Sequence, residues 1–277
     1  MIDNQVLRRA RFRSKVLRWP TVWARHLGIR DQDVVLASYP RSGTTWMRFL
    51  LAQALSGESS EFKAIRRIIP YVGQHRNALP VLPGGGRMMY SHDRFSRAAT
   101  QRAIYVVRDV RDVALSEYQW QQRIGVFKGD LDRFIGDFVS GRGNPFGSWG
   151  AHVDSWVEAD RISEGRLHVV KFEDLKRDAS TVLASALAFL GVSLNEVEIE
   201  DVVASNSVEM MRQKEDRAAQ GSFKQRVVKR NVRFINAGSV GGWQKTLSKA
   251  NERLLETAFG PQMLRLGYAL HSQHPEQ

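Results

Sequence analysis

Residues 38–46 have the composition of an anion-binding loop, Ser-Tyr-Pro-Arg-Ser-Gly-Thr-Thr-Trp. The segment follows a short apolar run and precedes a helix-like pattern, which predicts a strand, a tight loop and the first turn of a helix. The unpaired N–H groups and positive dipole end of such a helix attract phosphate or sulfate groups. Gly43 lets the backbone approach the anion closely. The loop also supplies side-chain donors: Arg41, Ser42, Thr44 and Thr45.

The charge of this segment differs from that of the nucleotide-triphosphate loop G-x-x-x-x-G-K-[ST]. When Gly43 is aligned with the second glycine, Ser38 replaces the first glycine and Thr44 replaces the lysine. Thr45 keeps the Ser/Thr position, and the cation is Arg41, inside the loop. The expected ligand is therefore an anion other than a magnesium-bound triphosphate. This difference argues against the first alternative, a P-loop kinase that needs magnesium and ATP.

A second segment, 105–116, reads Tyr-Val-Val-Arg-Asp-Val-Arg-Asp-Val-Ala-Leu-Ser. Its apolar run ends at Arg108, where a metal-dependent P-loop enzyme would place an acid for magnesium. A guanidinium there can hold a phosphate through two parallel hydrogen bonds, and Ser116, about two helical turns further on, can add a hydroxyl. The alternative is a surface cluster of ion pairs among Arg108, Asp109, Arg111 and Asp112.

Together the two segments resemble the motifs of the sulfotransferase family that uses 3′-phosphoadenosine-5′-phosphosulfate (PAPS). The 5′-phosphosulfate loop of that family has the pattern T-Y-P-K-S-G-T-T-W, and its 3′-phosphate segment has the pattern Y-[VI]-x-R-[ND]-x-[KR]-D-x-x-x-S. The resemblance extends over residues 33–268. It implies an enzyme that transfers a sulfuryl group from PAPS to an acceptor hydroxyl or amine and releases 3′-phosphoadenosine 5′-phosphate (PAP).

The resemblance also implies roles for individual residues. His92, which follows the apolar run 87–91, takes the position of the catalytic base, and Arg41 holds the 5′-phosphate as it leaves. The remaining donor-binding positions are Ser42, Gly43, Thr44 and Thr45 in the loop, Arg108 and Ser116 at the 3′-phosphate, and Trp46, Phe172 and Ser207 around adenine, with Phe172 in place of the family's tyrosine. Such a transfer depends on alignment and charge stabilisation. Because no His, Asp or Glu cluster has metal-ligand spacing, we expect no metal.

Residues 236–243 resemble the family pattern R-K-G-x-x-G-D-W but depart from it at the start. Asn236 and Ala237 replace the Arg-Lys pair that grips the 3′-phosphate, while Gly238 is kept. Nearby cations that could substitute are Lys229, Arg230 and Arg233. The departure leaves open a sulfotransferase fold that has lost its activity.

Four continuous apolar runs, 34–39, 87–91, 103–107 and 167–172, predict buried parallel strands. Helical patterns cover 44–55, 110–122 and 180–190, and Asp109 is the expected N-cap of the second. We therefore expect an α/β fold in a single domain, with a central parallel sheet flanked by helices in a three-layer sandwich similar to P-loop NTPases. Loops are expected at 79–87, 141–150 and 214–236, the last as a lid or a mobile loop.

The 277-residue chain carries a formal net charge of +12 and no cysteine. Eight basic side chains and one acidic side chain lie in residues 1–30, so we expect a basic N-terminal segment, 1–30, before a sulfotransferase domain, 31–277. The mildly basic remainder suits an anionic small molecule and argues against a nucleic-acid partner. The absence of cysteine and of a long apolar run favours a cytoplasmic protein. The N-terminal segment either packs on the domain or contacts an anionic membrane surface.

The acceptor is not specified by the sequence, which is compatible with a small molecule, a lipid or a glycan. Loops shape acceptor pockets, and several aromatic residues lie in or near the predicted loops. Candidates for an apolar wall are Tyr71, Trp120, Phe127, Phe146 and Trp149, although each of them could equally belong to the core. The oligomeric state is left open.

Overall fold

A single parallel sheet forms the centre of the computed structural model, which describes residues 24–58, 61–95, 102–157, 162, 164–220, 233–235 and 238–271. Its strands are β1 (Val34–Ser38), β2 (Met88–Ser91), β3 (Arg102–Val107) and β4 (Leu167–Lys171), in the order β2-β1-β3-β4. All three strand pairings are parallel. The four predicted strands and the α/β fold class are confirmed, and only the strand ends differ from the prediction by one residue or none.

Alternating residues of each strand face two separate hydrophobic cores. In β1, Val34 and Leu36 pack into one core, while Val35 and Ala37 pack into the other. Because both faces are covered, the strands are apolar throughout instead of alternating with polar residues. The sheet is therefore the middle layer of three.

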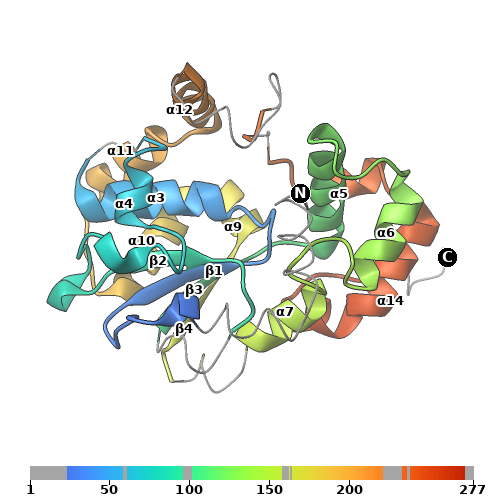
Figure 1. The fold of residues 1–277 in the computed structure, drawn as a ribbon, viewed down its shortest axis with the longest axis horizontal. Helices are drawn as coiled ribbons and strands as arrows, with labels where there is room; N and C mark the ends of the chain where they lie inside the picture. Colours follow the sequence, from blue (N-terminus) through green and yellow to red (C-terminus); the bar gives the residue numbers. More distant parts are fainter. Residues whose placement is uncertain are drawn as a thin grey trace, which may run out of the picture.

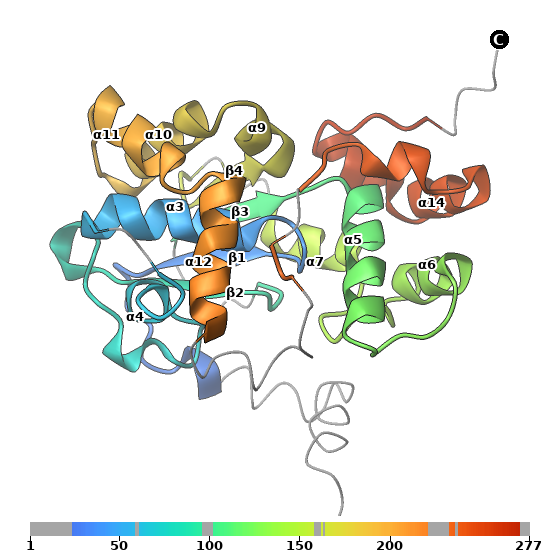
Figure 2. The same ribbon diagram turned by 90° about the horizontal axis from the view of Figure 1, so that it is seen from above.

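The first core is covered by α3 (Thr44–Ser56), α4 (Ile65–Ile68), α9 (Phe172–Arg177), α10 (Ala179–Leu190), α11 (Glu196–Ala204) and α12 (Val208–Gln220). The second core is covered by α5 (Val110–Arg123), α6 (Leu131–Val139), α7 (Trp149–Trp156) and α14 (Lys249–Arg265). Figure 1 shows these two groups of helices on opposite sides of the molecule, and Figure 2 shows the strands running between them. Three short 3₁₀ turns complete the described elements: His75–Asn77, Pro83–Gly85 and Gly242–Lys245.

The helix starts show why the sequence patterns were informative. Asp109 caps α5 as predicted, because its side chain accepts a hydrogen bond from the N–H of Arg111.

The predicted loop 214–236 is wrong for residues 214–220, which belong to α12. Its weak periodicity came from a helix with few apolar residues, and residues 221–232 and 236–237 lie outside the described part. The predicted loop 141–150 ends at Ser148, where α7 begins.

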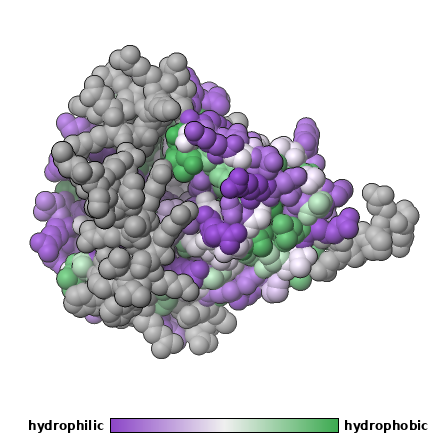
Figure 3. All heavy atoms as spheres, turned by 45° about the vertical axis from the view of Figure 1, so that its right-hand side comes forward, coloured by the Kyte–Doolittle hydropathy of each residue, from purple (hydrophilic) through white to green (hydrophobic). Residues whose placement is uncertain are grey.

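No helix in the described ranges is both long and apolar enough to cross a membrane. The coloured residues on the face seen in Figure 3 are mainly hydrophilic, with hydrophobic side chains in small groups among them. The predicted N-terminal segment 1–30 lies outside the described residues except for 24–30.

Candidate active site

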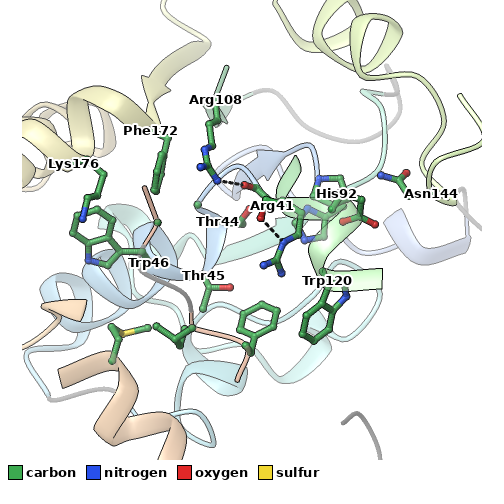
Figure 4. Close-up of a pocket in the computed structure, with 18 of the residues that line it drawn as sticks. Arg41, Thr44, Thr45, Trp46, His92, Arg108, Trp120, Asn144, Phe172 and Lys176 are labelled. Carbon is green, nitrogen blue, oxygen red and sulfur yellow. Dashed lines mark hydrogen bonds between the residues drawn. The ribbon is translucent and has the colours of Figure 1, made fainter. Parts of the chain in front are cut away.

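One cavity of about 330 Å³ lies at the edge of the sheet where the four parallel strands end. Each strand contributes a lining residue just after its carboxyl end: Arg41 follows β1, His92 follows β2, Arg108 follows β3 and Phe172 follows β4. Ligands of open parallel sheets bind at this edge. The topology thus brings together four predicted site residues that are far apart in the sequence (Figure 4).

The loop after β1 has the conformation of an anion cradle. Gly43 is the N-cap of α3 with φ 97°, a left-handed conformation that suits glycine. The first helical N–H groups, starting at Thr44, have no intrahelical acceptor and are available to a ligand. Arg41 also has a positive φ of 72°, the one such non-glycine value in the described ranges. Strain of this kind concentrates at functional sites.

The ring of Phe172 packs directly against this loop. A Cβ added at Gly43 would lie 2.3 Å from Cδ2 of Phe172, and a Cβ added at Gly238 would lie 3.1 Å from its Cζ. Phe172 is thus held between two glycines from distant segments, both of which line the cavity. A Cβ at Gly43 would overlap the ring, and a Cβ at Gly238 would require the ring to move by a few tenths of an ångström.

Arg41 points across the cavity towards α5. Its Nε donates to Ser116 Oγ at 3.2 Å, and its guanidinium lies over the rings of Trp120 and Phe234 at 5.1 and 5.3 Å. Burial lowers the pKa of Arg41, and the Glu117 carboxylate opposes that shift. Ser42 is fully buried and does not line the cavity, whereas Thr44, Thr45 and Trp46 do.

Arg108 joins the loop after β1 to the segment that follows residue 237. It donates from Nη1 to the Arg41 carbonyl at 3.2 Å and from Nη2 to the Ser239 carbonyl at 2.7 Å, and it lies over Phe172 at 4.7 Å. Its buried Nε has no partner among the described residues. A guanidinium with an unused donor beside a helix N-terminus fits a phosphate group.

The ion pairs of the alternative are present, with Arg108 3.6 Å from Asp112, but the four residues are buried instead of lying on the surface. Arg111 is 2% exposed and is paired with Asp109 and Glu256, each at 2.6 Å. Asp112 is also buried and accepts hydrogen bonds from the N–H groups of Gly241 and Trp243 at 2.8 and 3.1 Å. These carboxylates anchor the chain around the cavity, and Arg108 both pairs with Asp112 and lines the cavity.

His92 is oriented as a proton acceptor. Its Nδ1 lies 2.9 Å from the Ser38 carbonyl, which can only accept, so Nδ1 carries the proton. Nε2 of the neutral ring is then the unprotonated atom. Burial lowers the pKa of His92, although the hydrogen bond to Ser38 opposes this shift. The ring has edge contacts with Tyr90 and with Phe146.

Helix α7 holds the backbone that carries His92. His152 Nε2 donates to the His92 carbonyl at 3.1 Å, and Trp156 Nε1 donates to the Asp93 carbonyl at 3.0 Å. The N–H of Phe95 donates to Ser155 Oγ at 3.1 Å. Side chains of α7 therefore hold in place the backbone that follows β2.

The opposite end of the cavity is built from aromatic and polar groups on α3, α9 and the start of α12. Trp46 Nε1 donates to the Asn206 carbonyl at 2.9 Å, and the Lys176 ammonium lies over the Trp46 ring at 5.6 Å. Ser207 does not line the cavity; its hydroxyl accepts a hydrogen bond from the N–H of Met210. The neighbours Asn206 and Val208 line it instead.

Comparison with known proteins decides the family. Residues 31–267 match the family described as the sulfotransferase domain. The chain belongs to the sulfotransferase family. It is 27% identical over 247 residues to mouse sulfotransferase 2B1, an alignment that covers 85% of this chain and 72% of the relative. It is also 27% identical over 240 residues to rat sulfotransferase 1A1, with 80% and 81% covered.

Solved structures show the same fold at lower identity. Mouse sulfotransferase SULT7A1 complexed with PAP has a TM-score of 0.63 and 21% identity, with 85% of both chains covered. Retinol dehydratase in complex with androsterone and PAP has a TM-score of 0.68 and 18% identity, with 91% of this chain and 85% of that chain covered. The sulfotransferase is thus an enzyme that transfers a sulfuryl group from PAPS, as its two motifs predicted.

The segment that departs from the family pattern is only partly described. Asn236 and Ala237 lie outside the described residues, as do Lys229 and Arg230, while Gly238 lines the cavity. Arg233 is exposed and pairs with Asp216 at 3.2 Å, outside the cavity lining. Among the described residues of the sulfotransferase, Arg41, Arg108 and Lys176 are the lining cations.

Two of the five aromatic candidates for an acceptor wall line the cavity, Trp120 and Phe146. Trp149 is fully buried in the core, Tyr71 pairs with Tyr90, and Phe127 packs on Phe134. These three residues are aromatic like the two that line the cavity, and the sequence alone does not show which aromatic side chains point into the cavity and which into the core.

Several lining residues of the sulfotransferase were not predicted from the sequence: Glu117, Asn144, Lys176 and Asn206. Glu117 directly follows Ser116, but adjacent residues of a helix do not share a face, and Lys176 lies on α9, a helix that the sequence patterns did not predict. His152 was also missed, because its contact with His92 spans sixty residues of sequence. In the part of the chain that the structure covers, no group of three or more His, Cys, Asp or Glu could hold a metal ion.

Proposed function

We propose that this sulfotransferase transfers the sulfuryl group in line to the hydroxyl of a small, largely apolar organic molecule, with His92 as the general base. The observation that carries the proposal is the hydrogen bond from His92 Nδ1 to the Ser38 carbonyl. It leaves Nε2 unprotonated in the cavity that Arg41 and Arg108 also line. A base and two cations at three neighbouring strand ends suit proton removal beside an anionic donor.

The donor's two anionic groups fit two different parts of the cavity. The 5′-phosphosulfate suits the cradle at Gly43 and Thr44, where helix N–H groups and the Arg41 side chain meet. The 3′-phosphate suits Arg108, whose Nε has no partner among the described residues. Trp46 and Phe172 offer aromatic surface for adenine between these points. In this arrangement Arg108 makes the enzyme prefer a 3′-phosphorylated nucleotide.

The chemical step needs one proton transfer and one substitution at sulfur. The acceptor oxygen bonds to sulfur while the bond from sulfur to the 5′-phosphate oxygen breaks, and the hydroxyl proton passes to His92 Nε2. Arg41 and the N–H groups of the α3 N-terminus stabilise the charge that develops on the leaving phosphate. The neutral His92 ring is already in the protonation state that a base requires.

A small organic acceptor is supported by the shape and walls of the cavity. Its volume lies within the range of about 300–1,000 Å³ that is usual for small-molecule sites. Trp120, Phe146 and Phe234 line the part near His92. A protein of the same fold, retinol dehydratase, has been crystallised with androsterone and with retinol, and aromatic walls suit such apolar molecules.

Calorimetric titration with PAP, run beside ADP and ATP–magnesium, tests the donor site. We expect PAP to bind most tightly without magnesium, and Arg108→Ala to weaken PAP at least tenfold, since it removes charge-assisted hydrogen bonds worth about 1.5–3 kcal/mol. Arg177→Ala is the matched control, because Arg177 is exposed, pairs with Asp174 and does not line the cavity. Tighter binding of ATP–magnesium, with indifference to the 3′-phosphate, would contradict the proposal and favour a kinase.

A further inference from the structure

Glu117 is a buried carboxylate in the wall of the cavity. It lies on α5 directly after Ser116, one helical turn before Trp120, and is 6% exposed. One carboxylate oxygen, Oε1, accepts a hydrogen bond from Gln121 Nε2 at 2.8 Å. The other oxygen has no hydrogen-bond partner among the described residues, and it is not sealed off from the cavity.

The position of this carboxylate is fixed. Gln121 Nε2 also donates to the Gly143 carbonyl at 2.5 Å, which ties Glu117 to the loop between α6 and α7. Asn144 in that loop donates to Tyr39 Oη at 2.9 Å, and Tyr39 donates to the Gly147 carbonyl at 2.8 Å. The open oxygen is therefore a preorganised acceptor.

Glu117 lies in the acceptor part of the cavity. The loop that it is tied to carries Phe146, whose ring is 5.7 Å from that of His92. Figure 4 shows His92, Asn144 and Trp120 on one side of Arg41, with Phe172, Trp46 and Lys176 on the other. Through Gln121 and Gly143, Glu117 is tied to the loop that carries Asn144 and Phe146, on the His92 side.

No side chain neutralises Glu117 by direct contact in the described part of the chain. Burial has the largest effect and raises the pKa of Glu117, while the hydrogen bond from Gln121 and the charge of Arg41 oppose that shift. The Arg41 guanidinium instead contacts Ser116 and the rings of Trp120 and Phe234. A buried carboxylate without an ion pair is costly, and a cationic ligand would relieve that cost.

The surrounding rings favour the same kind of ligand. Aromatic faces attract cations, and an ammonium group is bound well where such faces meet a carboxylate. Trp120 and Phe234 already hold a cation in this structure, the Arg41 guanidinium. An apolar alcohol without a charged group would leave the open oxygen of Glu117 unpaired.

We infer that the acceptor carries a positively charged nitrogen, which pairs with the open oxygen of Glu117 while its hydroxyl faces His92. The inference rests on the proposed function, since it assigns the substrate class of the same site. Glu117 then acts as a specificity residue that selects amino alcohols or aminophenols over neutral alcohols of equal size.

Matched acceptor pairs test the inference. The pairs are tyramine with 4-ethylphenol, 4-(aminomethyl)phenol with 4-methylphenol, and 6-amino-1-hexanol with 1-hexanol, and the reading is the ratio of kcat/KM within each pair with PAPS as donor. We expect at least one ammonium compound to be preferred tenfold or more by the wild type. Glu117→Gln should lower that ratio about tenfold, whereas the exposed-site control Glu200→Gln should keep it.

Two results would overturn the inference. One is a wild-type enzyme that prefers no ammonium compound in any pair, and this reading does not depend on the folding of a variant. The other is a preference that persists in Glu117→Gln. PAP calorimetry on the same proteins distinguishes a failure of this inference from a failure of the proposed function. A wild-type enzyme that does not bind PAP would refute the proposed function. A wild-type enzyme that binds PAP but has kcat/KM ratios near one in every acceptor pair would refute only the role of Glu117.

Discussion

The imidazole of His152 donates from Nε2 to the backbone carbonyl of His92 at 3.1 Å. Its other nitrogen, Nδ1, accepts from the hydroxyl of Tyr105 at 2.9 Å, because Nε2 already holds the ring's one proton. His152 is fully buried, and burial lowers its pKa to about 3. A permanently neutral histidine on α7 therefore fixes the peptide of the histidine that faces the cavity.

Replacing His152 should impair turnover more than donor binding. His152→Phe keeps the ring volume but removes the donor to His92 and leaves the Tyr105 hydroxyl unpaired. Because small misplacements of a catalytic group are costly, we expect kcat to fall by at least about tenfold, with the PAP dissociation constant changed less than threefold. Steady-state kinetics and PAP calorimetry measure the two quantities.

The control for His152→Phe is His168→Phe. His168 lies on β4 and stacks on Phe189, on the opposite side of the sheet from α7. The His168→Phe variant should keep the wild-type kcat. Equal losses of kcat and PAP binding in His152→Phe would mean that the residue only supports the fold.

The His92 ring should titrate below the ordinary histidine range in the ligand-free enzyme. Burial disfavours the imidazolium, so the pKa of His92 is lowered, and the neutral base predominates at and above pH 6.5. The base is lost only when the pH falls through that lowered pKa. Nitrogen-15 NMR of the histidine rings, assigned with His92→Gln, should also find the proton on Nδ1. A proton on Nε2, or a pKa above 6.5, would disprove the arrangement.

Gly43 should tolerate no side chain. A Cβ there would lie 2.3 Å from Phe172, and φ is 97°. We expect Gly43→Ala to weaken PAP binding at least tenfold, because the cradle and the Phe172 ring cannot both keep their places. Calorimetry with PAP measures the effect.

Gly84→Ala is a control that separates overlap with the Phe172 ring from the backbone strain of a positive φ. Gly84 has a similarly positive φ of 72° but no atom within 4 Å of the position of a Cβ, so Gly84→Ala introduces only backbone strain. It should lower the unfolding temperature slightly and leave PAP binding intact. If Gly43→Ala and Gly84→Ala bind PAP equally well, the close approach of Gly43 to the Phe172 ring does not affect PAP affinity.

Much of the site could be predicted because it is local. The loop at 38–46 and the segment 105–116 each place their functional groups within a few residues of a strand end, and parallel strands bring those ends to one edge. The departures occur where position depends on distant contacts. Ser207 was expected in the cavity, but its hydroxyl accepts from the N–H of Met210 in the first turn of α12, and its neighbour Asn206 lines the cavity instead.

The missed residues have a common physical reason. Glu117 and Lys176 lie on helices whose orientation is set by core packing, so the sequence alone does not say which face meets the ligand. His152 has the pattern of any buried helical residue, and only the tertiary fold shows that its partner is the backbone of His92. Residues 214–220 looked like a loop because α12 has few apolar residues to mark a buried face.

A buried ion pair at the opposite end of β1 from the cavity should make the stability of the fold depend on pH in the acid range. Asp33 is fully buried and pairs with Arg87 at 2.6 Å. Burial raises its pKa, but the hydrogen bonds from Arg87 and Arg30 outweigh that effect, so the pKa is lowered overall. The stabilisation is complete above the unfolded-state pKa of about 3.9 and is lost as the pH falls through the lower folded-state value.

Asp33→Asn should therefore reduce the free energy of unfolding at neutral pH by about 3–5 kcal/mol, because it leaves the Arg87 charge buried without its partner. Asp174→Asn is a control of matched geometry, since Asp174 pairs with Arg177 at the same 2.6 Å but both side chains are exposed, and such pairs contribute about 0–1 kcal/mol. Urea unfolding at pH 7 and at pH 3 measures both effects. The difference between Asp33→Asn and the wild type should shrink at pH 3, because this pH lies below the unfolded-state pKa of about 3.9 and the unfolded wild-type chain then takes up a proton that folding must release. A difference that is unchanged between the two pH values, or one no larger than that of Asp174→Asn, would show that the ion pair with Arg87 does not stabilise the fold.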